Sequence, residues 1–284
     1  MKKNTFGIAA AFNGLFARRE GLAKTPVQSQ SDSAAAHTER GLAWFNKGDY
    51  DMAIAEYTQA LRSDPDFAGA YYNRGNIYRR KKNYDKAIAD YDKALQGDPN
   101  FAEAYYNRGV AWKNKGDVDK AIADYDQAIR LDPKYVSAYN NRGVAWKSKG
   151  DAGKAIADYT QAIRLDPKYV SAYSNRGNAW NEKGETDRAI ADCNEALRLN
   201  PNYAYAYNNR GAAWKNKGEY DKAIEDFNQA LQLNSNYIEA YYNRGLVYAA
   251  KGDPVLAEAD WEKVLRLNPN YARARQNLEK LRET

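Results

Sequence analysis

Small and apolar residues recur along the chain at the spacing of a helix face. In the stretch AEAYYNRGVAWKNKG, which begins at Ala102, they fall at Ala104, Tyr105, Gly109 and Trp112. These positions return about once per helical turn, so they lie on one side of an α-helix while polar residues occupy the other side. The pattern predicts a helix, which we call helix A.

A second apolar stripe begins after a short turn. Gly116 is expected to end helix A in the left-handed conformation, and Asp117 can cap the free amides of a new helix. The stripe of this second helix, helix B, consists of Val118, Ala121, Ile122, Tyr125, Ala128 and Ile129. Pro133 follows and disfavours helix in the residue before it. The two stripes therefore predict a tight helical hairpin.

The same pattern returns every 34 residues. The triplet Asn-Arg-Gly marks the register and begins at Asn73, Asn107, Asn141, Asn175, Asn209 and Asn243. A fixed period of this length indicates a repeat array. Seven blocks follow one another without insertion, at residues 34–67, 68–101, 102–135, 136–169, 170–203, 204–237 and 238–271. We expect an all-α solenoid, with residues 272–284 forming a half-polar helix that caps the last hairpin.

Residues 1–33 lie outside the period. They carry Lys2, Lys3, Arg18, Arg19 and Lys24 against Glu20 and Asp32, so half of the formal net charge of +6 lies in this segment. Its apolar stretch from Phe6 to Ala17 suggests a signal peptide, but Asn13 interrupts it and arginines stand where small residues would mark cleavage. We expect a flexible or amphipathic arm on a cytoplasmic protein. The alternative is an exported or periplasmic protein, and the stretch is too short to span a bilayer.

The block resembles the tetratricopeptide repeat family. The family pattern of aromatic, Leu-Gly, aromatic, Ala, aromatic and Pro is matched by Tyr105, Arg108-Gly109, Trp112, Ala121, Tyr125 and Pro133. The departures are arginine for leucine in every block, Lys82-Asn83 for a Gly-Asp turn, Cys193 for tyrosine, Ser235 for proline, and Glu258 for isoleucine. The resemblance implies a right-handed superhelix in which the A helices line the concave wall and the B helices lie outside.

The repeats offer few groups for catalysis. His37 is the single histidine and occupies a core position that is tyrosine in the other blocks; Cys193 also takes a core position, in a different block. A Cys-His nucleophile pair is therefore not expected. Metal-ligand sets and phosphate-binding glycine loops are also missing from the sequence, and aspartates such as Asp124 are expected on a solvated helix face. We predict a non-enzymatic protein without metal or cofactor.

The asparagines of the triplet suggest a binding surface. They fall beside the core stripe of helix A and so should form a ladder along the concave wall, where an amide can both donate to and accept from a peptide backbone. Packed helices lie roughly 8 to 10 Å apart, and an extended chain advances about 3.3 Å per residue. Each asparagine would meet about every third residue of a bound segment. The resemblance implies the same use, since related arrays hold extended peptides by such asparagines.

Aromatic and cationic residues accompany the ladder. Tyr72, Tyr106 and Tyr242 precede three of the asparagines, and Arg79, Lys113, Lys147 and Lys215 follow about one turn later. We predict a scaffold that binds an extended or disordered protein segment, with a preference for acidic ones. One alternative is self-assembly through the N-terminal arm. Another is nucleic-acid binding, which a cationic groove with stacking aromatics would allow but a nearly balanced charge in the repeats disfavours.

Overall fold

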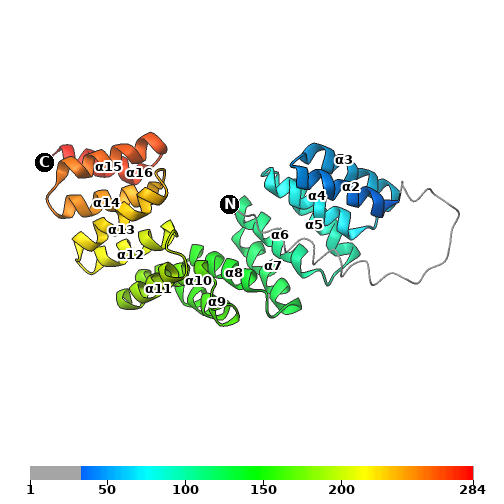
Figure 1. Ribbon diagram of the computed structural model, residues 1–284, viewed down its shortest axis with the longest axis horizontal. Coiled ribbons are helices and arrows are strands. Elements are labelled where there is room, and N and C mark those ends of the chain that lie inside the picture. The colour runs from blue at the N-terminus through cyan, green and yellow to red at the C-terminus, as the bar shows by residue number, and fades with distance from the viewer. Residues whose placement is uncertain (1–32, 284) are drawn as a thin grey trace. The chain divides into compact units, whose positions relative to one another are not determined.

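Residues 33–283 are described by the computed structural model, and every regular element in this range is an α-helix (Figure 1). The chain divides into two compact units at the turn between Leu131 and Asp132. In both units, consecutive helices pack as antiparallel pairs, and each pair packs against the next. The predicted all-α solenoid is thus confirmed.

Unit 1 contains three helical hairpins. Its helices are α2 (Ala34–Lys47), α3 (Tyr50–Ser63), α4 (Ala68–Arg80), α5 (Tyr84–Gly97), α6 (Ala102–Lys115) and α7 (Val118–Leu131). The even-numbered members are A helices and the odd-numbered members are B helices. Ser33 begins the unit as the N-cap of α2, since its hydroxyl accepts from the Ala36 amide at 3.1 Å.

Unit 2 contains four hairpins and a final helix. Its helices are α8 (Val136–Ser148), α9 (Ala152–Leu165), α10 (Val170–Glu182), α11 (Thr186–Leu199), α12 (Ala204–Asn216), α13 (Tyr220–Leu233), α14 (Ile238–Ala250), α15 (Pro254–Leu267) and α16 (Ala272–Arg282). Ala274 and Leu278 of α16 are buried against the α15 cluster of Trp261 and Val264. Helix α16 therefore caps the last hairpin, and Arg282 of α16 pairs with Glu258, the residue that replaces isoleucine.

The turns within the hairpins follow the predicted chemistry. Gly116 has φ of 98°, and Asp117 Oδ1 then accepts from the Lys120 amide at 3.1 Å. Lys82 occupies the equivalent turn between α4 and α5, with φ of 59°. This backbone region is unfavourable for a residue with a Cβ atom. The second hairpin therefore closes under local strain that glycine relieves in the other hairpins.

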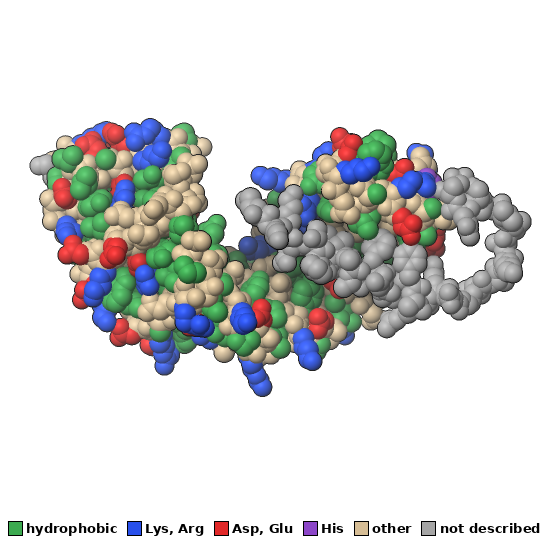
Figure 2. Space-filling view, viewed as in Figure 1, with side chains coloured by type: hydrophobic (Ala, Val, Ile, Leu, Met, Phe, Trp, Pro, Cys, Tyr) green, Lys and Arg blue, Asp and Glu red, His purple; other side chains and the backbone are tan. Residues whose placement is uncertain are grey.

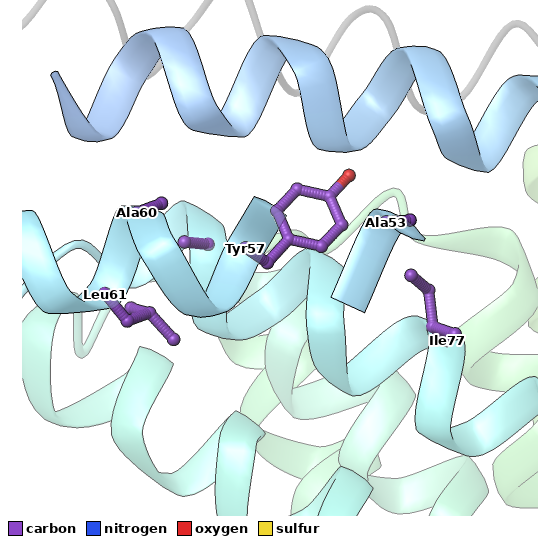
Figure 3. Close-up of a cluster of buried hydrophobic side chains, with 6 residues drawn as sticks. Ala53, Tyr57, Ala60, Leu61 and Ile77 are labelled. Carbon is purple, nitrogen blue, oxygen red and sulfur yellow. The ribbon is translucent and has the colours of Figure 1, made fainter. Parts of the chain in front are cut away.

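Aromatic rings of the B helices fill the space left by small residues of the A helices. A Cβ atom on Gly109 would lie only 2.8 Å from the Tyr125 ring, so glycine is required for this close approach. Figure 3 shows the equivalent ring of Tyr57 in the first core cluster, together with Ala53, Leu61 and Ile77. In α11 the position is taken by Cys193, which is fully buried as predicted, and burial raises the pKa of its thiol to about 12.

The arginines that replace the family's leucine are tied to buried aspartates. Arg108 donates from Nε and Nη2 to the carboxylate of Asp124 at 2.8 and 2.6 Å, and from Nη1 to Asp92 of the preceding B helix at 2.5 Å. The same bidentate pair within a hairpin joins Arg74 to Asp90, Arg142 to Asp158, Arg176 to Asp192, Arg210 to Asp226, and Arg244 to Asp260. The arginine of every Asn-Arg-Gly triplet is therefore paired with an aspartate of its own hairpin.

The prediction that these aspartates lie on a solvated face was wrong. Asp124 is only 5% exposed, because it sits on the side of α7 that faces α6, where Arg108 supplies the donors that water would otherwise provide. Burial raises the pKa of Asp124, and the Arg108 guanidinium opposes that effect. Helical periodicity could not predict this burial, because in the sequence a buried, salt-bridged carboxylate at the edge of an apolar stripe looks the same as a solvent-exposed one.

His37 also differs from the expectation of a packed core residue. Its side chain is mostly buried, with 15% exposed, but Nδ1 lies 2.7 Å from Oε2 of Glu56, to which Arg40 Nε donates at 3.1 Å. At the equivalent positions a tyrosine packs against the arginine, as where Arg108 Cζ lies 5.4 Å from the Tyr105 ring centre. The first hairpin thus replaces an aromatic contact with a polar cluster.

No helix among the described residues has the length and apolarity to cross a membrane. The expectations for the N-terminal arm, including a signal segment and its role in self-assembly, concern residues that lie almost entirely outside the described range.

Candidate functional site

The predicted site residues lie on one side of the A helices, which we call the A-helix face of each unit. In unit 1 it is formed by α2, α4 and α6, and in unit 2 by α8, α10, α12 and α14. Successive A helices contact one another within each unit, so equivalent residues of neighbouring repeats are close in space. The face therefore carries the ladder asparagines in register, one from each helix after the first.

The asparagine side chains bond to the preceding A helix. Asn107 Nδ2 donates to Tyr72 Oη at 2.9 Å, Asn175 Nδ2 to Asn140 Oδ1 at 3.0 Å, Asn209 Nδ2 to Ser174 Oγ at 3.0 Å, and Asn243 Nδ2 to Asn208 Oδ1 at 3.2 Å. Asn277 of α16 continues the series with a bond to Tyr242 Oη at 3.4 Å. The sequence signal for Asn277 was its place 34 residues after Asn243. The amide donors thus fasten neighbouring A helices together.

The Oδ1 atoms of the ladder asparagines accept fewer hydrogen bonds within the fold than their Nδ2 atoms donate. Among the described residues, none donates to Oδ1 of Asn107, Asn175 or Asn243. Oδ1 of Asn209 accepts from Asn208 at 3.4 Å, and Oδ1 of Asn141 accepts from Asn140 at 3.3 Å. Three ladder positions therefore keep an open acceptor.

Asn73 is the exception in the ladder. It is 7% exposed, and no bond from its Nδ2 to α2 corresponds to the bonds of the later ladder asparagines. Thr38 occupies on α2 the position that Tyr72 occupies on α4, and its hydroxyl donates to the Ala34 carbonyl at 2.8 Å. Unlike the later ladder asparagines, Asn73 therefore does not bond to the preceding A helix.

The four predicted cations fall into two groups. Lys147 is paired with Glu182 of α10 at 3.1 Å, so its charge is neutralised within unit 2. Arg79, Lys113 and Lys215 have no carboxylate partner among the described residues. Partial burial lowers the pKa of Lys113 and of Lys215 below the usual lysine value.

The predicted tyrosines are packed as well as partly exposed. The Tyr72 ring lies 4.5 Å from Phe101, Tyr106 lies 5.9 Å from Tyr125, and Tyr242 lies 5.2 Å from Tyr271. Their aromatic surface is therefore used within the fold.

An exposed tyrosine that was not predicted as a site residue lies in unit 2. Tyr205 of α12 is 56% exposed and is flanked by the rings of Tyr203 and Tyr237 at 5.5 and 5.3 Å. Its signal in the sequence was a tyrosine at a position that carries small or acidic residues in the other blocks.

A cavity of about 180 Å³ opens on the A-helix face of unit 1. Its wall is formed by Leu42, Phe45, Tyr57, Tyr72, Asn73, Asn76, Arg79, Arg80 and Asn107. It brings together members of the predicted set that come from α4 and α6. The described residues hold no group of His, Cys, Asp or Glu that could ligate a metal ion.

Family models of the tetratricopeptide repeat match residues 38–100, 102–135, 170–203, 193–225 and 238–271, and a TPR repeat model matches 145–180 and 215–252. The chain belongs to the tetratricopeptide repeat family. Members of this family are protein-interaction scaffolds, which agrees with the coarse function predicted from the sequence. No curated protein matches this TPR chain.

Solved structures of other TPR proteins share the fold. A tetratricopeptide repeat protein from Parabacteroides merdae is 22% identical, with a TM-score of 0.74 over 90% of this chain and 100% of its own. MamA is 32% identical, with a TM-score of 0.54 over 56% of this chain and 93% of its own. YrrB, described as a TPR protein with an unusual peptide-binding site, is 23% identical, with a TM-score of 0.55 over 69% of this chain and 97% of its own.

Proposed function

We propose that this TPR protein is a non-enzymatic scaffold whose A-helix faces bind an extended segment of a partner protein. The observation that carries the proposal is the open Oδ1 acceptor of Asn107, Asn175 and Asn243. The Nδ2 bonds fix the amide planes, so each acceptor is oriented before a ligand arrives. Pre-organised groups lose less entropy on binding.

The chemistry of the ladder fits a backbone ligand. The backbone N–H groups of an extended segment would donate to the asparagine oxygens, at about every third residue if neighbouring A helices lie roughly 8 to 10 Å apart. Lys113 and Lys215, which lack carboxylate partners among the described residues, favour an acidic segment. YrrB, a TPR protein similar to this chain, is described as having an unusual peptide-binding site, which supports peptide binding by an array of this kind.

The charge distribution supports a protein ligand over a nucleic acid. On the face shown in Figure 2, acidic and basic side chains are interspersed over the described helices of each unit. A nucleic-acid surface would instead gather basic residues into a continuous patch. A segment with both polar and acidic side chains matches this surface better.

The test separates the two roles of a ladder asparagine, which are to bond the preceding A helix through Nδ2 and to accept from the ligand backbone through Oδ1. Peptides selected from a random display library against the full chain would be measured by calorimetry with Asn175→Ala and, as the matched control, Asn140→Ala. Both variants lose the same bond between α8 and α10, but only the first removes the open acceptor. Asn175→Ala should weaken binding by about 2- to 10-fold relative to the control, the equivalent of one hydrogen bond.

Two results would contradict the proposal. One is an equal loss of affinity in both variants, which would assign the asparagine a structural role alone. The other is a set of selected peptides that cross-link to the outer surface of the B helices. Circular dichroism would confirm that both variants keep the fold.

A further inference from the structure

The turn of the last hairpin is apolar, unlike the turns before it. Ala250 ends α14, and Pro254, Val255 and Leu256 begin α15. All four residues are exposed, Val255 by 74% and Leu256 by 43%. A run of exposed apolar residues is unfavourable in water unless a partner covers it. We call these four residues the tail edge of unit 2.

The earlier hairpins carry polar residues at three of the same positions. The position of Val255 is aspartate in five of the six earlier hairpins, and that of Leu256 is lysine or arginine in five. The position of Ala250 is polar in all six. Helix α13 carries Asp221 and Lys222 there and forms the same kind of hairpin, so the fold does not require apolar residues at these positions. Packing within the last hairpin therefore does not explain the tail edge.

The position of Val255 belongs to the contact between successive hairpins. Lys217 Nζ donates to Asp187 of the preceding hairpin at 2.6 Å, and Lys251 pairs in the same way with Asp221. The aspartate of each pair occupies the position of Val255, so this position faces the hairpin that follows. In the last hairpin a valine stands there, and valine selects an apolar partner. The tail edge therefore continues the interface between hairpins, with an apolar residue in place of the ion pair.

Helix α16 covers the rest of this end of unit 2 and leaves the tail edge open. It packs on Trp261 and Val264 of α15 through Ala274 and Leu278. Its exposed side chains are mainly charged or polar, as a capping helix requires. The first hairpin of another copy could stack head to tail only in the place that α16 fills. Such stacking is therefore blocked, and the tail edge is the apolar part of this end that stays accessible.

Charged residues beside the tail edge are paired within unit 2. Lys251 pairs with Asp221. Arg282 of α16 pairs with Glu258 and Glu262, which follow the edge along α15. These pairs offer no uncompensated charge to a strongly charged partner. Two identical copies of the edge can meet without strong repulsion from them, and a twofold axis sets the same patch of each copy against the other.

We propose that the tail edge is a homodimer interface, in which the edge of one chain packs against the edge of a second copy about a twofold axis. The contact closes on itself, so the assembly stops at two chains. Four residues form a smaller patch than the roughly 800 Å² per partner of a typical stable interface, so the dimer should dissociate on dilution. The inference does not rest on peptide binding, because none of these residues belongs to the ladder.

The experiment measures the mass of the full chain by sedimentation equilibrium over about a hundredfold range of protein concentration. The parent should pass from one chain to two as the concentration rises and should stop at two. The double variant Val255→Asp, Leu256→Lys gives the last hairpin the residues that the sixth hairpin carries. It should dimerise at least about tenfold more weakly, because the apolar contact is lost. Leu256→Ala, which adds no charge, should also weaken the dimer.

Met52→Lys is the matched control for the double variant. Met52 is 41% exposed at the position in the first hairpin that is equivalent to Leu256, and Asp51 already precedes it. The change therefore gives the first hairpin the same Asp-Lys sequence. It should leave the dimerisation constant within about twofold, as expected for a surface substitution outside the interface. Circular dichroism would establish that all variants are folded.

The proposal is overturned if the parent remains a single chain at the highest concentration, including the case in which it instead binds uncharged phosphatidylcholine vesicles. A mass that continues to rise beyond two chains would also overturn it, as would a double variant that associates as well as the parent. An equal loss of association in Met52→Lys would place the contact in the first hairpin and likewise contradict the proposal.

Discussion

Unit 1 and unit 2 share their interior contacts but differ on their A-helix faces. The bidentate arginine–aspartate pair occurs in the second and third hairpins of unit 1 and in all four hairpins of unit 2. On the face of unit 1, both predicted cations, Arg79 and Lys113, have no carboxylate partner among the described residues, whereas unit 2 has one such cation, Lys215, and one, Lys147, that pairs with Glu182. Asn181 takes the equivalent position on α10 and accepts from Asn216 at 3.1 Å.

This difference shows which positions the fold constrains. Residues between the two helices of a hairpin must fit a shared geometry, so they repeat with little change. Residues on the A-helix face are less restricted, and their charges can vary from one unit to the other. Arg79, Lys113 and Lys215 are therefore left without a carboxylate partner in the described part of the chain, at positions whose charge the packing between hairpins does not fix.

The turns and caps also distinguish the units. In unit 1 the B helices begin with side-chain caps from Asp49, Asn83 and Asp117, whereas in unit 2 only Asp151 caps its B helix among the described turns, and Glu185, Glu219 and Asp253 make no such bond. Unit 1 in turn carries the strained turn at Lys82 (φ 59°). Each unit thus has a local weakness that the other lacks.

The largest effect is expected from breaking the pair that the units share. Arg108→Met leaves the buried Asp124 carboxylate without its two donors and should lower the free energy of unfolding by on the order of 2 to 4 kcal/mol. Arg210→Met should do the same in unit 2, where Asp226 is equally buried. Urea denaturation combined with hydrogen exchange would assign the loss to the mutated unit.

The double variant Arg108→Met, Asp124→Leu is the control for this prediction. Replacing both partners with apolar residues removes the unpaired charge, so most of the lost stability should return. A single Arg108→Met variant as stable as the parent would show that the pair makes no net contribution.

A smaller effect is expected at the turn that is particular to unit 1. Lys82→Gly should raise the stability of the second hairpin by about 0.5 to 1 kcal/mol, since release of left-handed strain exceeds the added entropy of the unfolded chain. The reverse change at the equivalent position, Gly116→Ala, should destabilise the third hairpin. An unfolding midpoint that falls for Lys82→Gly would contradict the assignment of strain.

The smallest effect concerns the charge of the unit 2 face. Glu182→Gln frees Lys147 and should raise the affinity for Ac-Ala-Ala-Ala-Asp-NH₂ by about 2- to 5-fold, the range of an exposed ion pair. Glu185→Gln is the matched control, because this residue contacts Arg188 and not Lys147. Equal effects of the two variants, measured by titration, would attribute the change to net charge alone.

Local sequence determined much of the fold. The 34-residue period, the glycine of each turn and the close approach of Gly109 to Tyr125 all depend on residues within one hairpin. Arg108 and Asp124 also belong to one hairpin and return at the same period, although their pairing becomes visible only in the structure. The same short-range contacts recur in every hairpin, so the sequence of a single block is enough to predict the fold of one hairpin.

The tertiary structure decided which groups of the site remain available. The ladder asparagines could be predicted to lie together, but not that their donors bond to the preceding A helix while Oδ1 of Asn107 stays open. Likewise, Lys147 and Arg79 are equivalent in the repeat, and only the neighbouring helix pairs one and leaves the other unpaired. The physical reason is that hydrogen bonding and charge pairing depend on side chains about one repeat away, whose contacts are fixed only when the hairpins stack.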